Sequence, residues 1–212
     1  YHYVLFNTGQ DLLIREGLDD YLAGQKNKIF VYGYADDRER RAFIMHRWPE
    51  YYRKLMNFKL HPIKILRRLR LDFYRRFPFN EKKTEYNTSD IVFYYNDMWA
   101  SYPFEVAEYI YKFWKATPSF FDIYKDALVP EEAFFLTIIM MSKYKSWVSF
   151  DETGKSNDLF CIRGINNGHP LVNTFDDVKE LESSGQFFSR KFDIRVDKNV
   201  VEYFYNKITK EA

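Results

Sequence analysis

The sequence has a single cysteine, Cys161, in 212 residues. One cysteine excludes an internal disulfide framework and favours a reducing compartment. No apolar run is long enough to cross a bilayer as a helix. A glycine-rich phosphate loop, a Walker motif, a Gly-x-Ser-x-Gly elbow and a zinc-spaced Cys/His pattern are all missing. This scarcity of cofactor motifs argues against a cofactor enzyme.

A marked excess of charge of one sign is also missing. Lys and Arg number 32 against 30 Asp and Glu, which leaves a formal net charge of +2. Because nucleic-acid-binding proteins carry a clear basic excess, this balance argues against nucleic acid as a partner. The chain is instead 46% hydrophobic and 20% aromatic, which is ample for a core of one or two compact units.

Strand-like and helix-like segments alternate along the chain, which predicts an α/β fold. Short β-branched and aromatic runs predict strands at 1–6, 28–33, 91–95 and 159–163. Helices are expected within 12–22 and at 103–115, 120–128, 175–184 and 198–208. Thr174 is the expected N-cap of the helix over 175–184. Solvated charge is expected at 36–41, and turns are expected at 96–101 and 166–170.

The most informative stretch covers 128–141 and predicts a buried helix that begins at Pro130. Glu131 and Glu132 fall in its first turn, where the helix dipole favours acids, so helix capping is the plain interpretation. The apolar run that follows supports a second interpretation. A carboxylate turned toward such a core is desolvated, has a raised pKa and suits a general base.

Segment 53–76 carries nine Lys or Arg residues against a single acid, Asp72. Ile63, Leu66, Leu69 and Phe73 recur within it at near-helical spacing. A basic amphipathic segment of this kind can lie on an anionic membrane surface. A surface helix that packs its apolar stripe on the protein and turns its charges to water explains the pattern equally well.

Four blocks, in order, resemble the core-2/I-branching glycosyltransferases and the related xylosyltransferases. Residues 3–12, YVLFNTGQDL, resemble the strand and turn "LLSGQDLP" of that family, and residues 99–101, WAS, resemble its "QWFS" segment. Residues 130–135, PEEAFF, resemble its "PDE-x-FF" helix start, and residues 189–193, SRKFD, resemble its "ARKFD". The blocks span essentially the whole chain. The resemblance is closest to bacterial members, which make surface or secreted polysaccharides.

The resemblance implies a GT-A fold, a mixed sheet flanked by helices around a nucleotide-sugar cleft. It implies one glycosyltransferase domain over 1–212. Within it, we expect the basic segment at about 53–78 to be a helical insertion that contacts the membrane. The implied reaction is inverting transfer from a UDP-sugar, typically UDP-N-acetylglucosamine, to a glycan hydroxyl, without metal or another cofactor. We expect it to occur in the cytoplasm, at the inner face of the membrane. The family's first strands, with the uridine pocket, are expected upstream of residue 1. A non-catalytic carbohydrate- or partner-binding remnant is therefore the alternative.

Carried onto this sequence, the family's general base falls at Glu132, with Glu131 beside it. The expected acceptor-binding residues are His46, Arg47, Trp48, Trp99 and Glu131. For Trp48, a place in the core is the alternative interpretation.

On the donor side, the expected residues are Asp11, Arg163, Arg190 and Lys191. Asp11 has no second acid beside it and makes a poor metal site, so Arg190 and Lys191 would balance the diphosphate charge instead. An ordinary solvated basic pair is the alternative for these two residues. The family's basic residue after "HP" is replaced by Leu171, and Arg163 is the nearest substitute.

Overall fold

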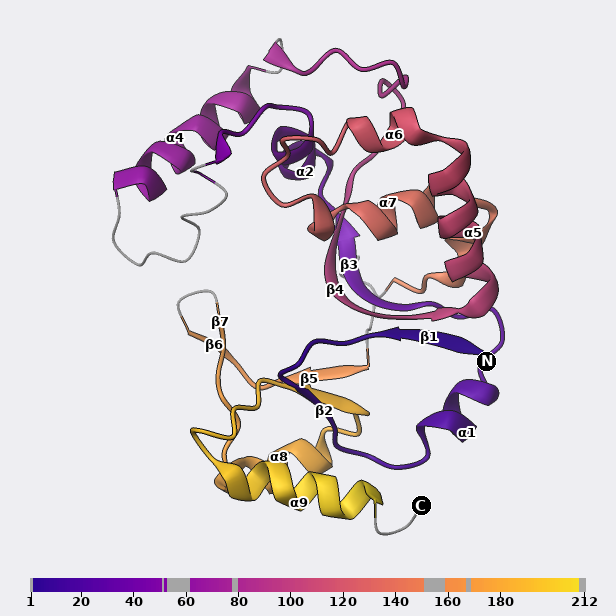
Figure 1. Ribbon diagram of the computed structural model, residues 1–212, viewed down its shortest axis with the longest axis vertical. Coiled ribbons are helices and arrows are strands. Elements are labelled where there is room, and N and C mark those ends of the chain that lie inside the picture. The colour runs from indigo at the N-terminus through magenta and orange to yellow at the C-terminus, as the bar shows by residue number, and fades with distance from the viewer. Residues whose placement is uncertain are drawn as a thin grey trace. The chain divides into compact units, whose positions relative to one another are not determined.

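The computed structural model describes residues 2–50, 52, 62–77, 80–150, 159–166 and 169–209 (Figure 1). The chain is mixed α/β, with small mixed and antiparallel sheets flanked by helices. It forms two compact units. Unit 1 comprises Tyr1–Val31, Trp99–Phe104 and Asn157–Ala212, and unit 2 comprises Tyr32–Met98 and Glu105–Ser156. Each is described separately.

The described part of unit 1 contains three sets of paired strands. Strand β1 (Tyr3–Phe6) pairs antiparallel with the end of β4 (Tyr94–Pro103), with Tyr3 opposite Pro103. Strand β8 (Phe188–Arg190) lies between β2 (Asp11–Leu13), which is antiparallel to it, and β5 (Phe160–Ile162), which is parallel. A short hairpin joins β6 (Ile165–Asn166) to β7 (His169–Pro170).

The helices of unit 1 supply two hydrophobic clusters. Helix α1 (Leu18–Ala23) packs its leucines with Phe160, Phe187 and Phe188. Helices α8 (Val178–Ser183) and α9 (Lys198–Thr209) pack against Phe192 in the second cluster. Thr174 and Asp177 form a capping box on the 3₁₀ turn η4 (Phe175–Asp177) that leads into α8, which confirms the predicted helix start.

Unit 2 is built on β3 (Phe30–Ala35) and the first half of β4, which are neighbours in one sheet. Its described helices include α2 (Asp37–Ile44), α4 (Pro62–Arg76), α5 (Phe104–Ala116), α6 (Pro118–Asp122) and α7 (Phe134–Met140). Two 3₁₀ turns flank α7, namely η2 (Pro130–Glu132) and η3 (Lys143–Trp147). Helix α7 approaches β3 closely at Gly33, where a Cβ atom would lie 2.4 Å from Leu136 Cδ2 and from the Tyr95 carbonyl oxygen.

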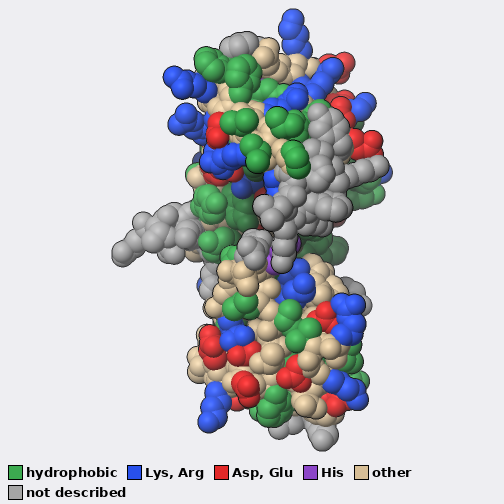
Figure 2. All heavy atoms as spheres, turned by 90° about the vertical axis from the view of Figure 1, so that its left-hand side faces the viewer, with side chains coloured by type: hydrophobic (Ala, Val, Ile, Leu, Met, Phe, Trp, Pro, Cys, Tyr) green, Lys and Arg blue, Asp and Glu red, His purple; other side chains and the backbone are tan. Residues whose placement is uncertain are grey.

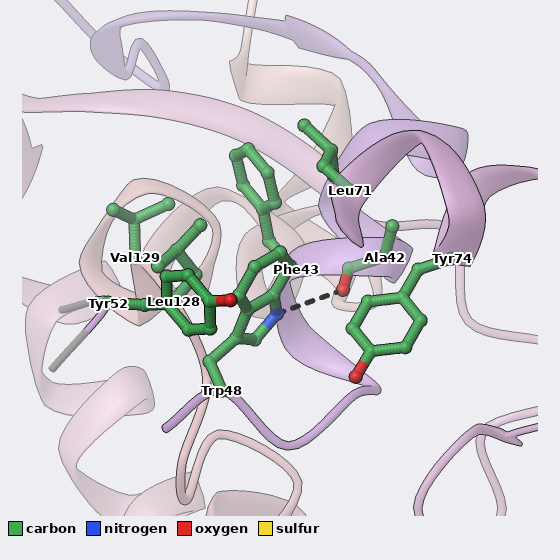
Figure 3. Close-up of a cluster of buried hydrophobic side chains, with 8 residues drawn as sticks. All are labelled: Ala42, Phe43, Trp48, Tyr52, Leu71, Tyr74, Leu128 and Val129. Atoms are coloured by element: carbon green, nitrogen blue, oxygen red, sulfur yellow. Dashed lines mark hydrogen bonds between the residues drawn. The ribbon is translucent and has the colours of Figure 1, made fainter. Parts of the chain in front are cut away.

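A cluster of buried hydrophobic side chains in unit 2 includes Leu128 and Val129, the two residues directly before η2 (Figure 3). Trp48 is 1% exposed, and its indole Nε1 donates a hydrogen bond to the Ala42 carbonyl at 3.2 Å. The other members are Phe43 on α2, Leu71 and Tyr74 on α4, Tyr52, and Leu128 and Val129 before η2. Full burial of each large apolar side chain stabilises the fold by roughly 1.5–3 kcal/mol. This cluster therefore holds α2, α4 and the approach to η2 together.

Three local predictions are wrong. Segment 36–41 belongs largely to α2, and its Arg40 is only 6% exposed because the helix turns it inward with Phe43 and Ile44. Residues 96–101 are not a turn, because β4 continues through them to Pro103. The helix expected over 130–141 is broken at Ala133, whose φ of −136° is not helical.

The side chain of Asn96 explains this break. It is fully buried, and its amide nitrogen donates to the Glu131 carbonyl at 3.3 Å while its oxygen accepts from the Leu136 backbone N–H at 3.3 Å. A strand residue thus bonds with backbone groups on both sides of Ala133. The two glutamates consequently lie in a 3₁₀ turn ahead of the α-helix.

The remaining expected elements are confirmed within a few residues. These are the strands at β1, β3 and β5, a strand beginning at Tyr94, and helices corresponding to α1, α5, α8 and α9. The helix expected over 120–128 is shorter and earlier, because α6 ends at Asp122. Of the predicted basic insertion, residues 53–61, 78 and the side chain of Ile63 lie outside the described residues. Residues 62–76 of that insertion form α4. No helix in the described part of the chain is long and apolar enough to cross a membrane.

Candidate functional site

The most distinctive polar arrangement in unit 2 pairs η2 with α2. Arg40 NH1 on α2 donates to Glu132 Oε2 on η2 at 2.7 Å. The Arg40 side chain is 7% exposed, and that of Glu132 is 35% exposed. One carboxylate is thus held by a buried guanidinium while part of it still faces solvent. This leaves Glu132 able to reach a ligand.

The guanidinium of Arg40 is itself held on several sides. Its Cζ lies 4.5 Å from the ring centroid of Tyr95 and 4.9 Å from that of Phe43, as in cation–π contacts. Its Nε lies 3.6 Å from Asp36 Oδ2, without a hydrogen bond. The Tyr95 hydroxyl donates to Asp97 in turn. Glu132 therefore meets a rigid cation.

Burial raises the pKa of the Glu132 carboxyl, and the nearby charges of Glu131 and Asp97 push it the same way. Arg40 opposes the shift, because its charge and hydrogen bond favour the carboxylate form. Burial likewise raises the pKa of Asp36 and, together with the hydrogen bond to Asp97, that of Tyr95 above its usual range. A carboxyl with a raised pKa and a fixed partner has the properties of a general base.

Glu131, the neighbour of Glu132, is exposed. Pro130 stands at the start of the 3₁₀ turn, as predicted, and Val129 before it is buried. The backbone carbonyl of Glu131 accepts a hydrogen bond from the Asn96 side-chain amide at 3.3 Å. The two carboxylates therefore differ: Glu132 is paired and partly buried, and Glu131 is open to solvent.

In unit 1, Arg190 at the end of β8 joins the turn that precedes β2. Its NH1 donates to Thr8 Oγ1 at 2.7 Å and to Asp11 Oδ1 at 3.2 Å. Its Cζ lies 4.6 Å from the ring centroid of Trp99. The side chain of Asp11 is fully buried and also accepts from the Thr8 backbone N–H. Three of the blocks that carry the family resemblance thus converge on Arg190.

Arg190 retains donors for a ligand. Both of its hydrogen bonds use NH1, and its buried Nε has no partner. Lys191 is half-buried, and its ammonium group forms no ion pair with any described residue. A cavity of about 240 Å³, lined partly by residues 9–12 and 192–195, lies at the same turn. Neither Arg190 nor Lys191 lines this cavity, so contact of the pair with a diphosphate stays a prediction.

Arg163 is engaged elsewhere in unit 1. Its Nε donates to Asn173 Oδ1 at 3.0 Å, and its NH1 lies 2.5 Å from Asp177 Oδ1. Asn173 continues the chain of bonds to the buried hydroxyl of Ser189, the residue before Arg190. Arg163 is therefore neutralised and supports β8. Its direct contact with a diphosphate stays a prediction.

The expected acceptor residues differ in their access to a ligand. His46 and Trp48 are each 1% exposed, and the His46 ring stacks on Tyr74 with centroids 3.8 Å apart. For Trp48 the alternative interpretation, a core residue, describes its position (Figure 3). Arg47 alone of the three has an exposed side chain, and Trp99 lies under Arg190 in unit 1. An acceptor role for these residues stays a prediction.

Arg40 and Tyr95 were not anticipated as site residues. Arg40 stands three and four positions before Phe43 and Ile44, which is the spacing of one helix face. Recognising a helix over 36–41 would have placed Arg40 on its buried side. The sequence predicts Tyr95 at a strand end and Asp97 in a turn, and nothing in its pattern joins either residue to Glu132.

Among the described residues, no three His, Cys, Asp or Glu side chains are grouped so as to hold a metal ion. No protein-family model matches the chain, and no curated protein sequence matches it. The functional assignment therefore depends on the residues themselves.

Proposed function

We propose that this protein is an inverting glycosyltransferase of the core-2/I-branching type, with a GT-A-like fold. It would transfer a sugar, which we expect to be N-acetylglucosamine, from a UDP-sugar to a glycan hydroxyl. The reaction would take place in the cytoplasm, at the inner face of the membrane, in the synthesis of a bacterial surface polysaccharide. Four sequence blocks in order support the family, and the surroundings of Glu132 support the chemistry.

The observation that carries the proposal is the environment of Glu132. Its carboxyl has a pKa raised by burial, is held at 2.7 Å by Arg40, and keeps about a third of its side chain exposed. Capping alone would explain an acid in a first turn, but it does not require a buried cation on a separate helix. Paired and partly exposed carboxyls of this kind are frequent at catalytic sites.

In the proposed reaction, Glu132 accepts the proton of the acceptor hydroxyl as that oxygen attacks the anomeric carbon. The bond between the anomeric carbon and the β-phosphate oxygen of UDP breaks on the opposite side, and its electron pair leaves with the diphosphate. Arg40 orients the carboxylate and favours its deprotonated form. Arg190 and Lys191 would stabilise the charge that develops on the diphosphate.

The test compares Glu132→Gln with Glu105→Gln, a matched change of an exposed acid in the first turn of α5. UDP release is measured with a panel of UDP-sugars and glycan acceptors, and UDP affinity by calorimetry. We expect Glu132→Gln to lower transfer by at least about 10²-fold, the usual contribution of a general base, while UDP affinity is unchanged. Glu105→Gln should behave as the unmodified protein does. Full activity of Glu132→Gln would refute the role of Glu132.

A second measurement addresses the metal. UDP titrations in the presence and absence of EDTA should give the same affinity if basic side chains alone balance the diphosphate. Loss of UDP binding in EDTA would require a cation in the donor site. Absence of UDP binding under both conditions would favour the carbohydrate- or partner-binding alternative.

A further inference from the structure

Several large apolar side chains on helix α4 are partly exposed. Its Leu71 and Tyr74 are buried against α2 and the cluster of Figure 3. The other large apolar side chains that the structure describes on α4 and just after it are exposed by 39–67%: Ile65, Leu66, Leu69, Phe73 and Phe77. Leu66, Leu69, Phe73 and Phe77 recur at spacings of three and four, and Ile65 stands four positions before Leu69, so the five form one stripe opposite the buried face. We call them the α4 stripe.

The α4 stripe is bordered by basic residues. Helix α4 contains six Lys and Arg residues against one acid, Asp72. Asp72 is shared by Arg68 and Arg75, and Arg75 also pairs with Glu39. The other cations of the helix make no ion pair with a described acid: Lys64, Arg67, Arg70 and Arg76. Figure 2 views the side of the molecule that carries α4, and it shows hydrophobic and basic side chains interspersed over its upper part.

A basic pocket opens at one edge of this helix. It measures about 370 Å³ and is lined by Arg47, Arg70, Tyr74 and residues 80–83. Four of these lining residues are cations: Arg47, Arg70, Lys82 and Lys83. The single acid, Glu81, is already bound by two nitrogens of Arg41 at 2.8 and 2.7 Å. The pocket is therefore left with a strong positive charge.

Two of the pocket residues are held in place. Lys82 Nζ donates to the carbonyl oxygens of Ile123 and Lys125 at 2.6 and 2.7 Å. Arg70 Nε donates to the Tyr74 hydroxyl at 2.6 Å, which fixes the guanidinium one helical turn along α4. Arg70 and Tyr74 stand between the buried face of α4 and the residues Phe73 and Phe77 of the stripe. The pocket and the stripe consequently adjoin along the same helix.

We infer that α4 lies in the plane of an anionic membrane, with the α4 stripe at the acyl boundary and the basic pocket around a lipid headgroup phosphate. A helix with Lys and Arg beside Leu and Phe is the type that binds at such interfaces. Its 15 residues extend about 22 Å along the surface at 1.5 Å per residue. An apolar stripe alone would fit a protein partner equally well. The Lys and Arg side chains beside it favour an anionic lipid surface instead.

The inference does not depend on the proposed transfer reaction, because lipid binding is measured without donor or acceptor. The full chain is sedimented with vesicles of phosphatidylcholine alone and with mixed phosphatidylcholine–phosphatidylglycerol vesicles. We expect binding to the mixed vesicles only, and weaker binding at high salt. Equal binding to both kinds of vesicle would overturn the headgroup site, and no binding to either would overturn the docking itself.

The stripe is tested with Leu69→Ser/Phe73→Ser. Leu69 is 61% and Phe73 is 44% exposed, and neither belongs to the buried cluster of Figure 3. The matched control is Tyr111→Ser/Trp114→Ser on α5, where two apolar side chains are 56% and 46% exposed. We expect at least about a tenfold loss of vesicle binding for the α4 variant, since burial of each apolar side chain contributes appreciably, and none for the α5 variant. Equal losses, or a change of oligomeric state with the α4 variant in the absence of vesicles, would overturn the inference.

The pocket is tested with Arg47→Glu/Lys83→Glu against Lys143→Glu/Lys145→Glu, which changes net charge equally at two exposed lysines of η3. The pocket variant should lose the preference for phosphatidylglycerol, and the η3 variant should retain it. Inorganic phosphate is added as the competitor. Failure of millimolar phosphate to displace the protein supports the lipid headgroup. Displacement by phosphate at constant ionic strength, or equal losses in both variants, would overturn the inference.

Discussion

Arg40 and Glu132 are 92 positions apart in the sequence, yet Arg40 NH1 lies 2.7 Å from Glu132 Oε2. The pair joins the buried side of α2 to the short η2 turn, and the ring of Tyr95 lies against the guanidinium. Each partner depends on the other, because the guanidinium is almost fully buried and the carboxyl has a pKa raised by burial.

Removing the cation should destabilise the fold. Arg40→Met keeps the apolar length of the side chain but leaves the Glu132 carboxylate without its partner. Breaking a fully buried pair costs about 3–5 kcal/mol, and we expect about 1–3 kcal/mol here because Glu132 is a third exposed. Urea unfolding measures the free energy directly. In the double variant Arg40→Met/Glu132→Gln, part of the loss should be recovered, and strict additivity would mean that the two side chains are not coupled.

The pH dependence of stability should show the raised pKa of Glu132. A carboxyl whose folded-state pKa lies above its unfolded value binds more protons in the native state between those two values. The free energy of unfolding should therefore fall as pH rises through that window, above the ordinary value of 4.5. Glu132→Gln should remove this contribution. A carbon-detected NMR titration of Glu132 that gave a pKa below 4.5 would contradict the expectation.

The acid limb of the activity profile should follow the same group. As a general base, Glu132 acts only when deprotonated, so kcat/KM should rise with pH through its raised pKa. Arg40 lowers that pKa, so Arg40→Met should shift the acid limb to higher pH. The shift is read from pH–rate profiles of UDP release, with Arg38→Met, an exposed residue of α2, as the control. If the acid limb does not move, Arg40 does not influence the group whose titration limits activity.

Gly33 should not tolerate a side chain. A Cβ atom there would lie 2.4 Å from both Leu136 Cδ2 and the Tyr95 carbonyl oxygen, and the backbone oxygen has no room to move. Gly33→Ala should lower stability by about 1–3 kcal/mol or more, as overpacking of a core does. Gly9→Ala is the control, because nothing lies within 4 Å of its added Cβ. Thermal unfolding compares the two, and equal melting temperatures would show that α7 packs less tightly on β3.

Arg190 and Lys191 should separate in their effects. Arg190→Ala leaves the buried Asp11 carboxylate without its cation and removes the guanidinium from Trp99, so both stability and UDP affinity should fall. Lys191→Ala breaks no described ion pair, so it should weaken UDP binding by about 3–30-fold with little change in melting temperature. Calorimetric titration with UDP measures the affinity, and thermal unfolding measures the stability. Unchanged UDP affinity in both variants would show that neither Arg190 nor Lys191 belongs to the donor site.

Local patterns in the sequence determined most of the secondary structure. The capping pair Thr174 and Asp177, the period of the residues in α5 and α9, and the β-branched runs at β1 and β3 are each specified by neighbours in the chain. Such signals extend over only one helical turn or a few residues, so they can be recognised in the sequence. The pairing of Pro130 with two following glutamates was equally visible, as was the basic amphipathic pattern of α4.

Tertiary contacts decided what these patterns leave open. Asn96 on β4 bonds on both sides of Ala133 and breaks a helix that the local sequence favours. Packing of α2 buries Arg40 and creates a partner for Glu132, while α4 buries Leu71 and Tyr74 and leaves Leu69 exposed. Periodicity shows which residues share a face, but only long-range packing selects the face that is covered. Burial and the charges of distant residues likewise set the pKa of Glu132, because desolvation depends on which chain segments exclude water from it.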